Sequence, residues 1–292
     1  MIKCCSTPLI ASEPFQLDRT LASYLVAADA VGLVEKFWPN DIGLRVSFRD
    51  FKTSEESLIM EVAHVWSKHG NIRFKRVDKW EDGDIRISGD PRKGSWSYIG
   101  TDCKSINLEH PTMNLGWLDV ETILHEFGHT LGLLHEHQNP FGGGFKWNKE
   151  NVIKDLSGPP NNWDKDRIEW NMFHMYSQDL LRGTDVDLDS IMLYFFPAHW
   201  TQDGKATQQN KDLSDKDKEF ISKVYPYHNK PVVQPDKTHF EEVMREAVPE
   251  RRYMNGWNRH TLRVVAAELG VNTQKNKSKF RLSKAISRVL DI

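Results

Sequence analysis

The stretch His125-Glu126-Phe127-Gly128-His129-Thr130-Leu131-Gly132-Leu133-Leu134-His135 decides the interpretation of this chain. Residues four positions apart share one helix face, about 6 Å apart along the axis, so His125 and His129 can reach one metal ion. Gly132 can end the helix because glycine takes the left-handed conformation without steric cost. The chain can then return His135 as a third ligand. Three neutral imidazoles leave a fourth position open for water, as in a catalytic zinc site.

Glu126 is predicted to be the general base of this site. It adjoins His125, and its carboxylate can reach a water on the metal without binding the metal itself. Zinc lowers the pKa of a bound water to about 7, so Glu126 could take its proton and later pass it to the leaving amine. The motif therefore predicts one catalytic Zn²⁺ and hydrolysis of peptide bonds without a protein nucleophile.

Hydrophobic periodicity places the motif on a helix over residues 120–131, with Asp119 as its N-cap and Glu121 in its first turn. Upstream, a helix is expected over 55–68. Strands are expected over 44–48, 71–77 and 84–88, with further candidates over 97–100 and 105–108. Strands alternating with a helix predict an α+β domain, with a mixed sheet and a long helix packed on it.

The rest of the chain divides into four parts by composition. Residues 1–36 contain an amphipathic helix candidate, either a prosegment that covers the cleft or an ordinary helix packed on the domain, which is favoured. Residues 37–228 form the expected catalytic domain. It is irregular over 138–189, apart from a short helix after Asn148, and it closes with a helix over 214–224. Residues 229–238 are a linker, and residues 239–292 show three short helical patterns.

Composition describes a chain with 39% hydrophobic and 27% charged residues, as in soluble globular proteins. No apolar run approaches the ~20 residues that a membrane-spanning helix needs. The net charge of −2 divides into +8 for residues 251–292 (ten Lys/Arg, two Asp/Glu) and −10 for the remainder (29 Lys/Arg, 39 Asp/Glu). This asymmetry indicates an acidic catalytic body and a basic C-terminal module.

The N-terminus has no recognisable signal peptide, which predicts a cytoplasmic protein or export by a leaderless route. Cys4, Cys5 and Cys103 are too few, and the first two too close together, for a disulfide framework. Cys103 is expected in a loop or in the core. Because thiolate is a good zinc ligand, Cys4 or Cys5 could occupy the open zinc position in a latent form.

The tract Ser190-Ile191-Met192-Leu193-Tyr194 follows the zinc motif. The pattern H-E-x-x-H-x-x-G-x-x-H with a later Met-turn is the metzincin signature, and the chain resembles the astacin-like metzincins over roughly residues 37–228. The resemblance implies that Met192 forms an apolar floor beneath the three histidines. It also implies that Tyr194 is a hinged extra ligand that stabilises the tetrahedral intermediate.

The resemblance further implies the metzincin fold, in which a five-stranded mixed sheet and two long helices lie over a mostly irregular lower subdomain. A small all-α module would follow at the C-terminus. An extended protein or peptide substrate would pair with an edge strand, for which the matching residues are Trp96, Ser97, Tyr98, Ile99 and Gly100. His137, next to the motif, is expected to lie behind the ligands or on the surface rather than to bind the metal.

The function expected from all of this is a zinc-dependent endopeptidase. The alternatives are a non-enzymatic binder that zinc stabilises, and a peptidase dedicated to one partner. The basic tail could be a targeting or docking module, which is favoured. It also loosely resembles SAP-type modules that bind nucleic acid, with phosphate contacts from Lys275, Lys277, Lys279, Arg281 and Lys284. The sequence does not give the oligomeric state.

Overall fold

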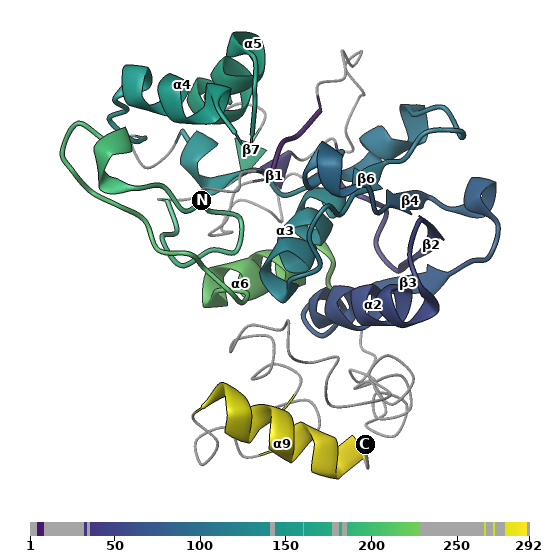
Figure 1. Ribbon diagram of the computed structural model, residues 1–292. Coiled ribbons are helices and arrows are strands. Elements are labelled where there is room, and N and C mark those ends of the chain that lie inside the picture. Colours follow the sequence, from purple (N-terminus) through teal and green to yellow (C-terminus); the bar gives the residue numbers. More distant parts are fainter. Residues whose placement is uncertain are drawn as a thin grey trace.

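The computed structural model describes residues 5–8, 32–33, 36–140, 144–159, 161–176, 181–182, 186–227, 266, 271 and 278–290 (Figure 1). Its central feature is a five-stranded sheet with the strand order β3-β2-β4-β6-β5. In that order, the strands are Ile72–Arg76, Ile42–Arg49, Ile85–Ser88, Met113–Asn114 and Trp96–Ser97. The first four pair in parallel, and β5 is antiparallel to β6 at the edge. The predicted mixed five-stranded sheet is confirmed.

Two long helices, α2 (Thr53–Ser67) and α3 (Val120–Thr130), pack against each other, and α2 also packs against β3 (Figure 1). Both helices were predicted within two residues of their observed ends. Their apolar faces and the sheet enclose the main core, in which Ile59, Trp66 and Phe127 are fully buried. Cys103 also lies in this core, as predicted.

The strand predicted over 105–108 is wrong. The 3-10 helix η4 (Gly100–Ser105) precedes a loop there, and the fifth strand is instead β6. The guanidinium group of the buried Arg86 explains the difference, because it donates hydrogen bonds to the carbonyl oxygens of Ile106, Asn107 and His110. A side chain thus satisfies the loop carbonyls that a neighbouring strand would otherwise pair.

The lower part of the domain contains more helix than the sequence indicates. Helix α4 (Lys149–Ser157) begins after Asn148, as predicted, and α5 (Lys165–Ile168) runs directly into a π-helix, η6 (Glu169–Phe173). These helices pack on a second, aromatic core that includes Trp163, Phe196 and Trp200. Short 3-10 helices complete the domain: η2 (Trp80–Asp82), η3 (Pro91–Lys93), η5 (Glu136–Gln138) and η8 (Ala198–Trp200).

The closing helix, α6 (Asp215–Val224), is capped by Ser214, as predicted. A small antiparallel sheet joins β1 (Gly32–Leu33) to β7 (Leu181–Arg182). In the tail, α9 (Lys279–Leu290) matches the third predicted helical pattern, and its Leu282 and Ile286 are buried. The predicted amphipathic helix of residues 1–36, the linker and the other two tail helices lie outside the described residues. Among the described helices, none combines the length and apolar character that crossing a membrane requires.

Candidate metal centre

Helix α3 carries the first part of the motif and is held at its N-terminus and along its length. At its N-terminus, Asp119 Oδ1 accepts a hydrogen bond from the backbone N–H of Thr122 (2.9 Å), which satisfies one free donor of the first turn. Along its buried length, the indole of Trp66 in α2 donates to Leu124 O (3.0 Å). The first two motif histidines therefore project from a rigid element, one turn apart on the same face.

The turn after α3 depends on the glycine that the motif requires. Gly132 has φ +98°, a conformation that favours glycine, and a Cβ built there would lie 2.5 Å from the Phe37 ring. The next residue returns its backbone N–H to Gly128 O (3.0 Å), so the chain closes tightly over the helix end. This turn brings His135 back beside the first two histidines.

Each motif histidine donates its Nδ1 proton to an oxygen that can only accept. The acceptors are Ile191 O for His125 (2.7 Å), Leu133 O for His129 (2.9 Å) and Gln138 Oε1 for His135 (3.2 Å). The Nε2 atoms therefore keep their lone pairs, and those of His129 and His135 lie only 2.9 Å apart. Lone pairs that face each other this closely repel unless a cation lies between them, so the donor set fits a metal ion.

Cys5 adds a sulfur atom to the three nitrogen atoms. Its Sγ lies 3.0 Å from His125 Nε2, 3.7 Å from His129 Nε2 and 3.2 Å from His135 Nε2. All four candidate ligand atoms lie within 4.8 Å of one another, and all four side chains are buried. Three imidazoles and one thiolate are a ligand set that tetrahedral zinc accepts.

Glu126 lies in the same space, beside Cys5 and His125. The residue has 0% exposure, and neither carboxylate oxygen has a hydrogen-bond partner in the described part of the chain. Burial raises the pKa of Glu126 well above its ordinary value, and the neighbouring Cys5 side chain opposes the rise. A buried carboxyl group without a partner is costly to the fold, so such a group is a functional-site candidate.

The imidazole groups of this cluster are held neutral. Burial lowers the pKa of His125 to about 4, and lowers the pKa values of His129 and His135 well below their ordinary range. His125 and His137 also disfavour protonation of His129 and His135. Neutral imidazole is the form that binds a metal ion.

Met192 lies against the middle of α3. A Cβ built at Gly128, between the first two histidines, would come within 2.4 Å of Met192 Sδ. The turn that carries Met192 is fixed by the buried Asp217, which accepts hydrogen bonds from Ser190 Oγ (2.7 Å) and Ile191 N (2.8 Å). Because Ile191 O in turn accepts from the first histidine, Asp217 orients that ligand indirectly.

Tyr194 belongs to the aromatic core and also lies beside the candidate ligands. Its ring centroid is 4.2 Å from that of His135 and 4.8 Å from that of His137. Its hydroxyl group donates to Cys5 O (2.5 Å) and lies 3.3 Å from Cys5 Sγ. The tyrosine therefore reaches both the candidate metal position and a backbone carbonyl group next to it.

Residues 5–8 lie in a cleft between β5 and the lower helices. Ser6 pairs with Trp96 as a parallel bridge, and Ser6 N donates to Ser95 O (3.4 Å) on the upper side. On the lower side, Asn171 Oδ1 accepts from Thr7 N (2.9 Å). An extended peptide segment thus occupies the edge of the sheet, next to the histidines.

The five residues expected to bind substrate do not all face this cleft. Trp96 and Ser97 form β5, and Trp96 lines the cleft with residues 6–8. Tyr98 N instead donates to Thr112 O (3.0 Å), Ile99 packs with Leu134 and Tyr176, and Gly100 begins η4. Backbone pairing along the edge is therefore limited to the first part of the predicted stretch.

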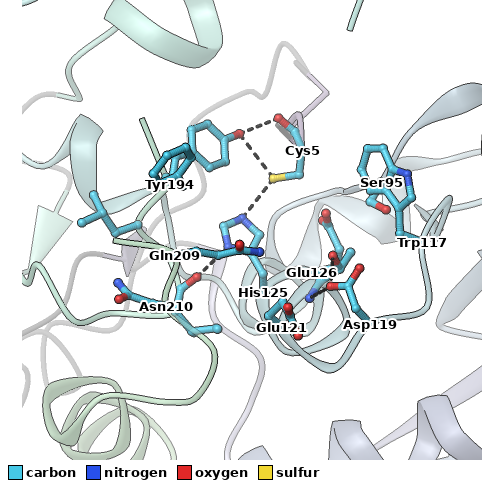
Figure 2. Close-up of a pocket in the computed structure, with 14 residues that line it drawn as sticks. Cys5, Ser95, Trp117, Asp119, Glu121, His125, Glu126, Tyr194, Gln209 and Asn210 are labelled. Carbon is cyan, nitrogen blue, oxygen red and sulfur yellow. Dashed lines mark hydrogen bonds between the residues drawn. The ribbon is translucent and has the colours of Figure 1, made fainter. Parts of the chain in front are cut away.

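On the other side of Cys5, a cavity of about 350 Å³ remains open (Figure 2). Figure 2 shows the Cys5 sulfur directed at His125, with Tyr194 above it and Glu126 alongside. Trp117, Glu121 and Leu193 are among the lining residues. The cleft thus continues past the candidate metal position in both directions.

Sequence reasoning missed three residues that the structure brings to this region: Arg167, Asn171 and Asp217. Asp217 could have been found, since Ser214 and Asp217 have the spacing of a capping box.

His137 was expected either behind the ligands or at the surface. The structure places it behind the ligands, where it is buried. Its Nε2 donates to Asn171 O (2.8 Å).

Comparisons with known proteins agree with this geometry. The sequence model of the family described as Astacin, a family of peptidases, matches residues 31–226. The solved structure of myroilysin is 34% identical to this chain, with a TM-score of 0.64, and the match covers 68% of this chain and 100% of that one.

Curated relatives include bone morphogenetic protein 1 of Xenopus laevis, which is 26% identical over 165 residues, 55% of this chain and 21% of that protein. Astacin-like metalloprotease toxin 1 of Loxosceles intermedia is 28% identical over 170 residues, 57% of each chain. This chain thus matches only part of the length of these relatives. The chain belongs to the astacin family, and its residues 31–226 are a zinc-dependent metalloendopeptidase domain.

Proposed function

We propose that the whole protein is an endopeptidase in which His125, His129 and His135 bind the catalytic zinc ion and Glu126 is the general base. The observation that carries this proposal is the convergence of three Nε2 lone pairs on one buried point beside a carboxylate that has no hydrogen-bond partner among the described residues. We propose the domain boundaries 1–36, 37–228, 229–238 and 239–292 with it, and α9 supports a helical C-terminal module.

Zinc, when bound, supplies a Lewis acid that polarises water and the carbonyl group of the substrate. Glu126 accepts a proton from the attacking water and passes it to the amine of the cleaved bond. Tyr194 donates a hydrogen bond to the substrate oxygen as negative charge develops on it, as its hydroxyl group does to Cys5 O in this conformation. Met192 supports the ligands from below.

The substrate is proposed to be an extended stretch of protein or peptide paired with β5. Residues 5–8 support this binding mode because Ser6 pairs with Trp96 in the cleft. Backbone pairing recognises peptides largely irrespective of their side chains. Substrate choice then depends on the walls of the cleft.

Cleavage of casein tests the proposal. In a parent chain that carries Cys5→Ala, and so lacks the sulfur atom beside the three histidines, we expect cleavage that a chelator abolishes and that Glu126→Ala reduces by about 10² to 10⁴-fold, the usual contribution of a general base. Glu109→Ala, at an exposed turn, is the matched control. Cleavage by the Glu126→Ala variant at the parent rate would contradict the mechanism.

We also propose that residues 5–8 hold the described conformation in a latent state, with Cys5 as the fourth zinc ligand. Cys5 Sγ is within 3.7 Å of all three Nε2 atoms, where it excludes water from the open position. Thiolate is a strong ligand for zinc and competes with water. The segment that would block the site is thus bound through the same cleft that substrate needs.

Cobalt substitution tests this latent state directly. We expect the Co²⁺-loaded full chain to show a thiolate-to-cobalt charge-transfer band, which Cys5→Ala removes and Cys103→Ala retains. We expect Cys5→Ala to cleave peptides faster than the parent. A band that survives in Cys5→Ala would show that Cys5 is not a ligand.

A further inference from the structure

We propose that Asn171 and Arg167, on the lower wall of the cleft, form a substrate subsite that residues 6 and 7 occupy in the latent state. Asn171 would accept a backbone N–H of the substrate, and Arg167 would donate to an oxygen-bearing side chain next to it. The inference rests on the proposed endopeptidase function and adds a specificity determinant to it.

The carboxamide group of Asn171 is fixed in one orientation. Its Nδ2 donates to Arg167 O (3.0 Å) within the helix, so its Oδ1 must face the cleft. There Oδ1 accepts both Thr7 N (2.9 Å) and Thr7 Oγ1 (3.3 Å). A side chain that is 2% exposed, with one acceptor directed at an extended peptide, is built to receive a backbone donor.

Arg167 contacts the neighbouring position of the bound segment. Its Nη2 donates to Ser6 Oγ (2.5 Å), and its guanidinium group lies 5.1 Å from the centroid of the Trp163 ring. Burial lowers the pKa of the Arg167 guanidinium below its ordinary value, and the nearby Tyr194 and Asp164 side chains oppose the fall. A stacked guanidinium presents a planar set of donors, which suits Ser, Thr, Asp or Glu side chains better than apolar ones.

The two residues also connect the subsite to the metal site. Asn171 O accepts from His137 Nε2 (2.8 Å), and the His137 ring stacks on those of His135 (5.2 Å) and Tyr194 (4.8 Å). A substrate held by Asn171 is therefore held at a fixed position relative to the candidate ligands. Positioning of this kind contributes to the rate because small misplacements near the reacting atoms are costly.

Strand β5 forms the upper wall of the cleft and supplies the backbone pairing. Ser6 pairs with Trp96 while its side chain meets Arg167, and the next residue meets Asn171. An extended peptide presents groups to both sides, so one strand can satisfy β5 and the lower wall together. The latent segment and a substrate would therefore compete for the same donors and acceptors.

A double-mutant cycle with N-methylated peptides tests the subsite. The protein is the zinc-loaded full chain with Cys5→Ala, with and without Asn171→Ala. Each peptide of a cleavable series is methylated at one backbone nitrogen. We expect one position at which methylation raises KM by about 2-fold to 10-fold, the range of one hydrogen bond, and we expect Asn171→Ala to abolish that penalty. Asn107→Ala, at an exposed turn, should leave the penalty unchanged.

The second arm exchanges the side chain next to that position. Replacing Ser with Ala there should weaken binding by about 2-fold to 10-fold in the parent and should have no effect with Arg167→Gln. If no methylated position depends on residue 171, and no side-chain preference depends on residue 167, the subsite proposal is wrong.

Calorimetry with the same peptides and the Cys5→Ala, Glu126→Ala protein measures binding without cleavage. This measurement separates the subsite proposal from the proposed endopeptidase activity. If binding depends on residue 171 but the Cys5→Ala protein cleaves no peptide, the subsite stands and the proposed activity fails. If cleavage proceeds without dependence on residue 171, the activity stands and the subsite fails.

Discussion

Helix α3 and residues 5–8 bring candidate ligand atoms to the same point in different ways. Helix α3 is enclosed by the main core, capped by Asp119 and tied to α2 through Trp66. Residues 5–7 are also buried and Pro8 is half-buried, yet the segment lies in a cleft through pairing with one short edge strand and contacts to the lower wall. We infer from this difference that α3 is a permanent part of the metal centre and that residues 5–8 are a removable part.

The largest effect of any substitution should come from removing a histidine of α3, the permanent part of the metal centre. We expect His129→Ala to lower zinc affinity by more than about 100-fold, because loss of an outer hydrogen-bond partner already costs 10- to 100-fold. A competition titration with a chromophoric chelator measures this. His110→Ala, at an exposed position, should leave the affinity unchanged. If the two variants bind zinc equally well, α3 does not carry the site.

Glu126→Gln should separate binding from chemistry on the same helix. In the Cys5→Ala background, we expect kcat to fall by about 10² to 10⁴-fold while the zinc content stays the same, because the amide cannot accept the proton. Activity and bound zinc are measured on one preparation. A parallel loss of zinc would instead make Glu126 part of the binding site.

The free energy of unfolding of the domain should depend on pH through Asp217, which holds the turn beneath α3. Burial raises the pKa of Asp217 to about 6, while hydrogen bonds from Ile191 N, Ser190 Oγ and Ser214 N oppose the rise. A carboxyl group with a raised folded-state pKa binds its proton more tightly when folded, so its contribution to stability falls as pH rises from about 4 to 6. From that shift we expect a loss of about 2–3 kcal/mol in the free energy of unfolding.

Urea unfolding of the parent and of Asp217→Asn at pH 4.5 and pH 6.5 measures this contribution. The parent should lose more stability between the two pH values than the variant, which has no carboxyl group to titrate. Equal losses in both proteins would show that the buried carboxyl group keeps an ordinary pKa. Asp82→Asn, at an exposed position, is the matched control.

The smallest effect should come from the removable part. Removing the hydrogen bond to Thr7 N with Asn171→Ala should increase the rate at which iodoacetamide labels Cys5 by about 2-fold to 10-fold. A Cys4→Ser, Cys103→Ala background and peptide mapping by mass spectrometry confine the signal to Cys5. Unchanged labelling would mean that other contacts alone hold the segment in place.

The sequence predicted the parts of the site that neighbouring residues determine. The spacing of His125, Glu126, His129 and His135 is local, and a helix followed by a glycine turn converts it directly into geometry. The closing helix was also predicted from its local pattern, whereas the edge position of Trp96 was predicted from the family resemblance. The local features need no knowledge of what the rest of the chain packs against.

The remainder depends on contacts between residues far apart in the chain. Asn171 and Thr7 meet across 164 positions, so no local pattern marks this pair. Cys5 and His125 meet across 120 positions, and the sequence suggested Cys4 or Cys5 at the zinc position only through the affinity of thiolate for zinc. The strand expected over 105–108 failed for the same reason, because the Arg86 guanidinium takes its carbonyl groups. Single-sequence periodicity describes how a segment can fold and does not identify its partner.

The capping box of α6 affects when the metal site can form during synthesis of the chain. Asp217 both caps α6 at Ser214 and holds the turn that carries Met192. During synthesis the helix with the motif leaves the ribosome early, yet the turn beneath it cannot be fixed until residue 217 has followed. Domains generally fold as units, so the nascent chain cannot complete its zinc site before nearly the whole domain has been translated.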